Sequence, residues 1–396
     1  MADYNPELES LVRELNQKAS SGGQDGAQED TVSAPQPVES LPPEATESLD
    51  RILKHAVDRG ASDVLFVAGS GIVLRLGGHL ERSPEPVLTD EAIRSLLLPL
   101  LLPERRAELE TQRSFDFSFV REGIGRFRVN LHYQRGTLAA ALRILPAEIP
   151  TLESLNLPPH IGKLVDRKQG LILVTGATGS GKTSTQAALM GIVNRKYPYH
   201  VVSIEDPIEY YHEDERSVFE QIEIGHDATD FTAALRSLLR QNPDVILVGE
   251  MRDPETVATV LSAAETGHLV LSTLHTNDAV QAVNRIVDQF PAGRQEQIRQ
   301  QLSLGLLAII AQQLLPSPDG KNRFPAVEIL LANTAVRHLI RKGEDHMLGS
   351  QLSLGRGDGM IMMEQSLAEL VQKGKVSREV AEAHCLREGE LQRYLV

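Results

Sequence analysis

The chain has little of three things, and each scarcity excludes a class of protein. Cys385 is its only cysteine, so no intrachain disulfide and no cysteine-rich zinc site can form. Its most apolar runs, residues 96–102 and 304–310, are far shorter than the roughly 20 residues that cross a bilayer. With 40 basic against 54 acidic residues, the formal net charge is −14. That balance argues against nucleic acid as the main partner, because such binding depends on Lys and Arg neutralising phosphates.

The N-terminus also lacks the basic-then-apolar pattern of a secretion signal. Together these features predict a cytoplasmic protein whose contact with a membrane is peripheral or made through partners.

What the chain does have is an octapeptide, GATGSGKT at residues 176–183, that fits the phosphate-binding pattern GxxxxGK[ST]. An apolar run, residues 171–175, precedes it, and a segment able to form a helix follows it. Backbone N–H groups of such a loop, at the start of a helix, can bind a polyphosphate. The lysine would reach the β- and γ-phosphates, and the threonine hydroxyl would sit on Mg²⁺. The predicted binding residues for ATP are Gly176, Ala177, Thr178, Gly179, Ser180, Gly181, Lys182 and Thr183.

Composition and periodicity divide the chain into five parts. Residues 1–46 are an acidic tail, expected to be flexible, in which Leu8, Leu11, Val12 and Leu15 have the spacing of a short helix. Helical and alternating segments over 47–150 predict a compact α+β domain, followed by a proline-rich linker at 151–159. Continuous apolar strands alternate with helices over 160–315, which indicates a parallel sheet covered on both faces. Residues 316–396 are expected to be mainly helical.

Two acidic segments follow predicted strands of this sheet, where ligands bind in open α/β folds. Glu205 and Asp206 follow the second strand, and Glu250 follows the third. Gly249 occupies the position where many phosphate-loop hydrolases carry a Mg²⁺-supporting aspartate, so Glu205 or Asp206 is the natural substitute. We therefore assign Thr183, Glu205 and Asp206 to Mg²⁺, partly through water, and Glu250 to the attacking water.

Histidines and arginines complete the set of candidate catalytic residues. His268 and His275 flank one strand at its opposite ends, too far apart to share a metal; His275 falls at the carboxyl end and could sense the γ-phosphate. Arg126 and Arg128 project from one face of a strand in the first domain, and paired arginines suit recognition of phosphate oxygens. For each of these side chains a purely structural role is the alternative.

Four segments in fixed order give the chain its family resemblance: GATGSGKT at 176–183, IEDPIE at 204–209, NPDVILVGEMRDPET at 242–256 and TGHLVLSTLHTNDA at 266–279. They resemble the Walker A motif, Asp box, Walker B motif and His box of the secretion and type IV pilus motor ATPases. Within that superfamily the chain is most similar to the twitching-motility (PilT-type) retraction ATPases, through GRFRVN at 125–130 and IVDQFP at 286–291. It has no tetracysteine zinc insertion, which extension and type II secretion ATPases usually carry.

The resemblance implies an α/β fold: an N-terminal PAS-like α+β domain, a RecA-like P-loop ATPase domain and a short helical C-terminal region. It also implies a homohexameric ring at the inner face of the cytoplasmic membrane that hydrolyses ATP to withdraw pilin, working with a platform protein and the pilus machinery.

Alternatives remain open at this point. The segment AVRHLIRK at 335–342 has His338 and Lys342 where the family typically has Asn and Glu. An accessory retraction ATPase beside a second motor, a pilus-extension or type II secretion ATPase, and a nucleotide-gated regulatory or scaffold protein without motor turnover are the other interpretations.

Overall fold

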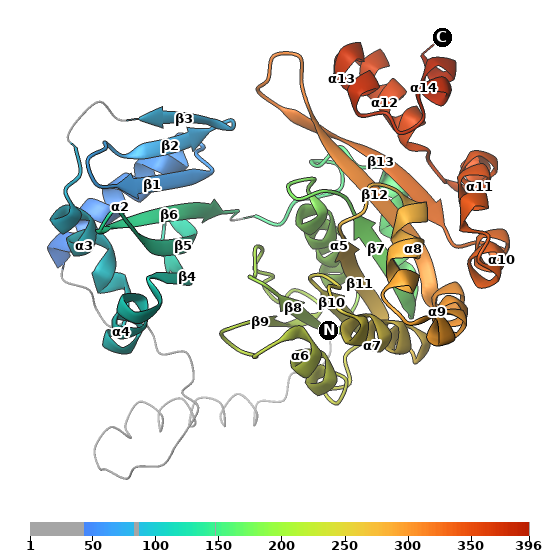
Figure 1. The fold of residues 1–396 in the computed structure, drawn as a ribbon, viewed down its shortest axis with the longest axis horizontal. Helices are drawn as coiled ribbons and strands as arrows, with labels where there is room; N and C mark the ends of the chain where they lie inside the picture. The colour runs from blue at the N-terminus through green and yellow to red at the C-terminus, as the bar shows by residue number, and fades with distance from the viewer. Residues whose placement is uncertain (1–42, 83–86, 147, 396) are drawn as a thin grey trace.

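The chain folds into two α/β units joined by a short connection (Figure 1). The structure, a computed structural model, describes residues 43–82, 87–146 and 148–395. The helix expected at residues 8–15 and most of the acidic tail lie outside the described residues. No helix in the described part of the chain is both long and apolar enough to span a bilayer.

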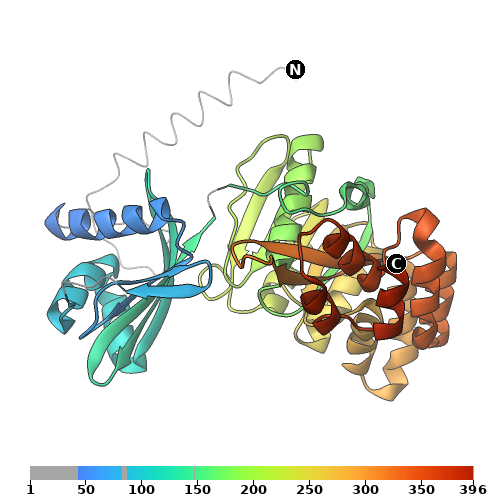
Figure 2. The same cartoon turned by 90° about the horizontal axis from the view of Figure 1, so that it is seen from above.

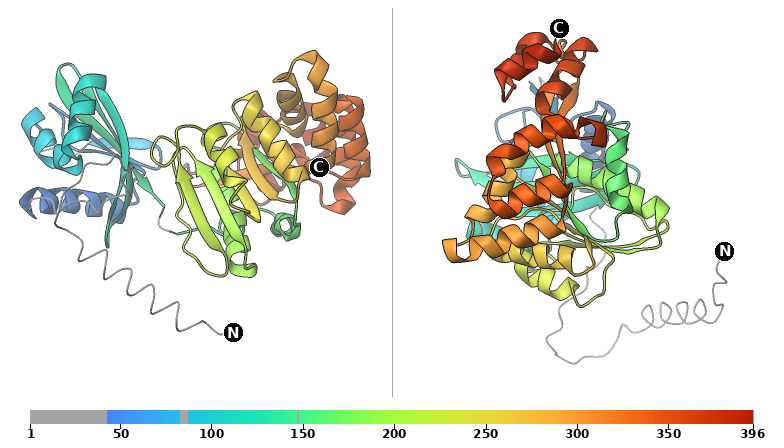
Figure 3. Two further views of the ribbon diagram at one scale, coloured as in Figure 1. Left: turned by 90° about the horizontal axis from the view of Figure 1, so that it is seen from below. Right: turned by 90° about the vertical axis from the view of Figure 1, so that its right-hand side faces the viewer.

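The first unit is a six-stranded antiparallel sheet with helices on one face. The strand order is β3-β2-β1-β6-β5-β4. Its elements are α2 (Pro43–Asp58), β1 (Asp63–Val67), β2 (Val73–Leu76), β3 (His79–Arg82), α3 (Asp90–Leu97), η1 (Leu98–Leu100), α4 (Pro103–Gln112), β4 (Ser114–Arg121), β5 (Gly125–Gln134) and β6 (Thr137–Leu145). The alternation along β5 sends Phe127, Val129 and Leu131 into the core under the helices, while Arg126 and Arg128 face the other way. The helices cover the face of the sheet turned away from the second unit (Figures 2 and 3).

The second unit is a seven-stranded sheet of order β13-β12-β7-β11-β10-β8-β9. All neighbours pair in parallel except β12 and β13, which form an antiparallel hairpin at one edge. Its elements are η2 (Pro159–Asp166), β7 (Gly170–Thr175), α5 (Lys182–Lys196), β8 (His200–Glu205), β9 (Val218–Glu223), α6 (Phe231–Leu238), β10 (Val245–Val248), α7 (Pro254–Glu265), β11 (Leu269–Leu274), α8 (Ala279–Asp288), α9 (Ala292–Gly305), β12 (Leu306–Pro316) and β13 (Arg323–Leu331). The apolar strands expected within residues 160–315 are confirmed: the run 171–175 lies in β7, and β8, β10 and β11 are further buried strands of the sheet.

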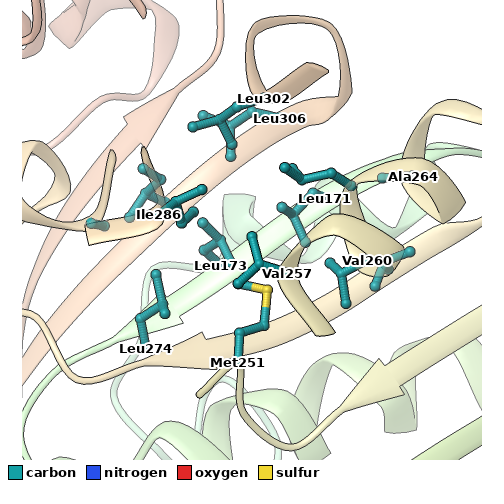
Figure 4. Close-up of a cluster of buried hydrophobic side chains, with 14 of the residues drawn as sticks. Leu171, Leu173, Met251, Val257, Val260, Ala264, Leu274, Ile286, Leu302 and Leu306 are labelled. Atoms are coloured by element: carbon teal, nitrogen blue, oxygen red, sulfur yellow. The ribbon is translucent and has the colours of Figure 1, made fainter. Parts of the chain in front are cut away.

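Burial on both faces explains why these strands are apolar throughout rather than alternating. Leu171 and Leu173 of β7 pack with Met251, Val257 and Leu274 on one face (Figure 4). Ile172, between them in sequence, packs into the cluster on the opposite face beneath α5. Each fully buried side chain of this size contributes about 1.5–3 kcal/mol, so the sheet is a rigid platform for the loops at its ends.

The structure adds detail at two of the expected boundaries. Residues 316–396 are mainly helical, but β13 first extends the sheet to Leu331 and the helices begin at Thr334. The linker 151–159 packs on the second unit, since Leu152 and Leu157 are buried in its core. In both places apolar side chains find partners that are distant in sequence, which local composition does not reveal.

The C-terminal helices follow β13, and one of them, α12 (Met363–Gln372), packs on that strand beside a buried charge cluster. They are α10 (Thr334–Lys342), η3 (Asp345–Met347), α11 (Leu348–Leu354), η4 (Gly355–Asp358), α12 (Met363–Gln372), α13 (Arg378–Ala383) and α14 (Glu388–Tyr394). Glu328 and Glu364 are fully buried, and Arg387 Nη1 lies 3.9 Å and 3.5 Å from their Oε2 atoms. Glu328 Oε1 also accepts a 2.9 Å bond from the N–H of Ala279, the first residue of α8. Burial raises the pKa of Glu328 to about 7.

This raised pKa predicts a pH-dependent stability. The folded chain holds the Glu328 proton up to about pH 7, whereas a glutamate with the ordinary pKa of 4.5 releases it earlier. The free energy of unfolding should therefore fall as pH rises from about 4.5 to about 7, and level off above. Since one pKa unit is worth about 1.4 kcal/mol, the fall is on the order of 3 kcal/mol. Glu328→Gln should remove this fall in the free energy of unfolding. Urea unfolding of both proteins at several pH values between 5 and 8 measures the difference. Parallel pH curves for the two proteins would contradict the assignment.

Candidate functional site

One edge of the large sheet gathers the residues singled out from the sequence. Because β7, β11, β10 and β8 run parallel and nearly in register, their carboxyl ends meet at the same edge. Gly176 follows β7, His275 follows β11, Glu250 follows β10, and Glu205 ends β8. Three loops and a strand end therefore surround one crevice, the usual ligand position in open α/β sheets.

The phosphate-binding loop has the backbone conformation its glycines predict. Gly176 (φ 146°) and Gly181 (φ 88°) are both in regions that side chains rarely adopt. A side chain at Gly176 would also collide with the carbonyl oxygen of Gln312. Gly181 is the N-cap of α5 and supplies no side-chain cap, so the first N–H groups of this 15-residue helix are left for an anion.

Gln312 of β12 braces this loop, and no sequence motif pointed to it. Its Nε2 donates to the carbonyl of Ser180, and its Oε1 accepts a 2.8 Å bond from Thr185 Oγ1. The side chain is buried, so both amide ends are satisfied inside the protein. Only the pairing of β12 with β7, which brings residue 312 beside residue 176, could have revealed it.

Removing this brace should weaken nucleotide binding. We expect Gln312→Ala to destabilise the fold by about 1–3 kcal/mol, because Ser180 and Thr185 lose a buried partner. The loosened loop should bind an ATP analogue about tenfold more weakly by calorimetry. Gln313, the next residue of the strand, makes none of these hydrogen bonds, so Gln313→Ala is the matched control. Equal affinities for the two variants would contradict a role for Gln312 in shaping the loop.

Lys182 is held within the loop by the loop's own carbonyls. Its Nζ donates to Gly176 at 2.9 Å and Ala177 at 3.1 Å. Burial lowers its pKa, and the nearby carboxylates of Glu250 and Glu209 partly oppose that effect. Glu250 and Glu209 thus both act electrostatically on Lys182. Glu209 lies in the segment 204–209, but sequence reasoning gave it no role.

Glu250 lies in the crevice between Arg252 and His275. Its carboxylate pairs with Arg252, and its Oε2 is 3.4 Å from His275 Nε2. Its side chain is only 14 % exposed. A side chain at Gly249, the residue before it, would lie tightly against the Ile204 carbonyl oxygen, 3.2 Å from its Cβ.

Glu205 and Asp206 differ in accessibility. Glu205 is buried, and its Oε1 accepts from Ser203 Oγ at 2.7 Å and Gln221 Nε2 at 3.1 Å. Burial raises the pKa of Glu205. Asp206 is exposed and acts electrostatically on Arg252, beside Glu250.

The donor set suits a magnesium ion bound together with a nucleotide. Within the described ranges, no group of three or more His, Cys, Asp or Glu side chains could hold a metal by itself. Mg²⁺ commonly keeps several waters and binds one or two protein oxygens plus substrate phosphates, so such a cage is not needed. Thr183, half-buried in the first turn of α5, and the exposed carboxylate of Asp206 fit that requirement. Glu205 has one oxygen committed to protein hydrogen bonds and fits a role through water.

Arg126 connects the first unit to this edge of the second. Its Nη2 donates to the Ile208 carbonyl at 2.6 Å, and its guanidinium lies 3.3 Å from the centre of the Tyr211 ring. The side chain is buried, and burial lowers its pKa. Arg128 is more exposed and lies 3.9 Å from Asp116 of its own sheet. The two arginines thus share a strand face, but only Arg126 contacts the second unit.

Removing Arg126 should loosen the loop that follows β8. We expect Arg126→Ala to increase hydrogen exchange over residues 206–211, because one hydrogen bond and one cation–π contact are lost, each worth about 1 kcal/mol. Arg128→Ala removes the neighbouring arginine without that contact and serves as the control. Unchanged exchange in the Arg126 variant would show that the domains are held by other contacts.

His268 is the one candidate that the fold separates from the others. It precedes β11, at the amino edge of the sheet, where its Nδ1 lies 3.1 Å from the Ala263 carbonyl. Leu269 and Leu274 mark opposite ends of that strand, so His268 and His275 lie at opposite edges, as the spacing predicts. The structure does not bring His268 to the nucleotide edge of its own chain; the assignment of a catalytic role there is not supported.

Comparison with known proteins agrees with this geometry. The profile of a family described as type II/IV secretion system protein matches residues 44–385. The type IV pilus ATPase PilU of Pseudomonas aeruginosa is 41 % identical over 85 % of this chain and 88 % of its own length. The type IV pilus retraction ATPase PilT of the same organism is 39 % identical over 84 % of this chain and 96 % of its own length. A crystal structure of the pilus retraction motor PilT with bound ADP superposes with a TM-score of 0.81 at 45 % identity, covering 87 % of this chain and 98 % of that one.

Proposed function

The chain belongs to the type II/IV secretion system protein family, and we propose that it is an ATP-hydrolysing motor that powers retraction of type IV pili. The observation that carries the proposal is the crevice itself, where the phosphate-binding loop, with Lys182 held on the Gly176 and Ala177 carbonyls, and Glu250 lie at the same edge of the parallel sheet. The similarity of this chain to the ADP-bound PilT chain, which extends over 98 % of that chain, supports nucleotide binding in this crevice.

In this proposal each group has a distinct task. The N–H groups of residues 176–183 and the Lys182 ammonium bind the phosphates, and Thr183 with Asp206 would hold Mg²⁺, which would supply charge neutralisation for the phosphates. Glu250 orients the attacking water and receives its proton. His275, 3.4 Å from Glu250 Oε2, responds to the loss of the γ-phosphate by changing its contact with that carboxylate. Glu205, held in place by Ser203 and Gln221, would support that ion through water.

In this proposal, the motor does work by changing the orientation of the first unit relative to the second. Arg126 ties the first unit to the loop after β8, and Arg128 lies two residues away on the same strand face. We assign both to transmitting events at the phosphate to the first domain, with Arg128 free to approach phosphate oxygens. A head-to-tail homohexamer suits this task, because heterologous contacts close into rings. We place the ring in the cytoplasm, against the inner-membrane platform of the pilus.

A deletion strain tests the direction of the motor. Loss of a retraction motor should leave cells hyperpiliated and unable to twitch, and the wild-type gene should restore both properties whereas a Glu250→Gln gene should not. Cells without pili would instead indicate an extension motor. Purified full-length protein should hydrolyse ATP in the absence of DNA; a protein that binds ATP without turnover would be a regulator or scaffold.

One observation favours a second candidate, an accessory retraction ATPase. Identity to PilU, 41 % over 335 residues, matches identity to PilT, 39 % over 333 residues. An accessory motor would hydrolyse ATP and yet fail to restore retraction when it is the only such ATPase in the cell. Expressing the chain in a strain that lacks every other retraction ATPase separates the two functions.

A further inference from the structure

The first domain has a groove that the proposed ATPase reaction does not use. It lies between α2 and the β2–β3 hairpin and has a volume of about 650 Å³. Its floor is apolar, made of Ile52, Ile72 and Leu74, of which Leu74 is buried and the two isoleucines are half-buried. This size is in the range of grooves and pockets that bind ligands.

The rim of the groove is basic. Arg51 and His55 line it from α2, one helical turn apart, and Arg82 lines it from the end of β3. Arg59 pairs with Glu81 across the groove at 2.8 Å. In the described part of the chain, neither Arg51 nor Arg82 has an ion-pair partner. An apolar floor with a cationic rim selects an acidic segment that carries apolar side chains.

The chain carries such a segment directly before α2. Residues 1–42 contain eight acidic residues and two basic ones, Arg13 and Lys18. Within them, Leu8, Leu11, Val12 and Leu15 recur at the spacing of one helix face, with acidic residues between. Charge and apolar content therefore complement the rim and the floor of the groove.

Chain length permits the contact. Residues 16–42 join the apolar residues of this segment to α2, and a random coil of that length would span about 30 Å on average. The groove begins at Ser48, within two turns of the start of α2. A tether of this reach gives an effective concentration on the order of 1 mM, so even a weak contact is well occupied.

We infer that the groove between α2 and the β2–β3 hairpin is the docking site of the chain's own acidic N-terminal segment, with Leu8–Leu15 on the apolar floor and the acidic side chains on Arg51 and Arg82. The tail is thereby a ligand of the N-terminal domain rather than a passive extension.

Photo-crosslinking in the full-length chain tests this docking. A benzophenone amino acid replaces Ser10, beside the apolar residues, and adducts are mapped by mass spectrometry. We expect adducts within residues 48–82, and a yield at least fivefold lower when Arg51→Glu and Arg82→Glu are combined, or when Leu8→Glu and Leu15→Glu are combined. Charge reversal elsewhere in the domain, Arg105→Glu with Arg135→Glu, is the matched control and should leave the yield unchanged.

Mixing isotope-labelled with unlabelled protein identifies whose tail is bound. Adducts within a single isotope class support docking in the same chain, whereas adducts of mixed isotope content would overturn it in favour of a neighbouring subunit's tail. Adducts confined to residues outside 48–82, or a yield equal in the groove and control variants, would also overturn it. Because the readout is a crosslink, failure here leaves the ATPase proposal untouched, and loss of turnover in a Glu250 variant leaves the docking untouched.

Discussion

Lys182→Ala is expected to lower the kcat/KM for ATP by about 10²–10³-fold, the cost of removing one preorganised charged donor from a phosphoryl-transfer site. The Lys182 ammonium donates hydrogen bonds to the Gly176 and Ala177 carbonyls of the loop. The carboxylates of Glu250 and Glu209 act on it electrostatically. No other lysine lies in the loop, so no neighbour replaces it. Steady-state phosphate release measures the loss, and nucleotide affinity should fall with it.

Lys196→Ala provides the control on the same helix. Lys196 lies at the far end of α5, exposed and paired with Asp166 at 2.7 Å. A surface pair of this kind contributes about 0–1 kcal/mol, so turnover should stay close to that of the wild type. If both lysine variants hydrolyse ATP normally, the octapeptide does not bind the phosphates and the proposed mechanism fails.

Glu250→Gln is expected to reduce kcat by about 10²–10⁴-fold while ATP still binds, since a general base contributes that much. Glutamine keeps the shape of the side chain and can still accept from Arg252 and His275, but it cannot take a proton from water. The effect should therefore appear in kcat, with little change in the dissociation constant of ATP.

Two further variants test whether Glu250, rather than another carboxylate, is the general base. Glu255→Gln changes an exposed carboxylate on the neighbouring helix α7, where it pairs with Arg236, and should leave kcat unchanged. Glu209→Gln removes the other carboxylate beside Lys182. Normal turnover in the Glu250 variant together with loss of turnover in the Glu209 variant would move the base to Glu209.

Local sequence was a good guide wherever a side chain's role depends on its own strand or loop. The strand over 171–175, the glycines of the loop and the opposite placement of His268 and His275 all follow from spacing. It was a poor guide to β13 and to residues 151–159, whose apolar side chains are buried by elements far away in the chain. Gln312 and Glu209 were missed for the same reason: one acts across a strand pairing, the other across a loop that folds back towards α5.

The sequence by itself determined the chemistry: a phosphate loop, a carboxylate after a buried strand and a family of motor ATPases, because short motifs are sufficient to specify backbone conformation and reactive groups. Only the tertiary structure decided which of these groups meet. It brought Glu250 and Glu209 close enough to act electrostatically on Lys182, and it turned Arg126 into the loop after β8. The physical reason is that distance in space is set by strand order and burial, which depend on contacts between residues remote in sequence.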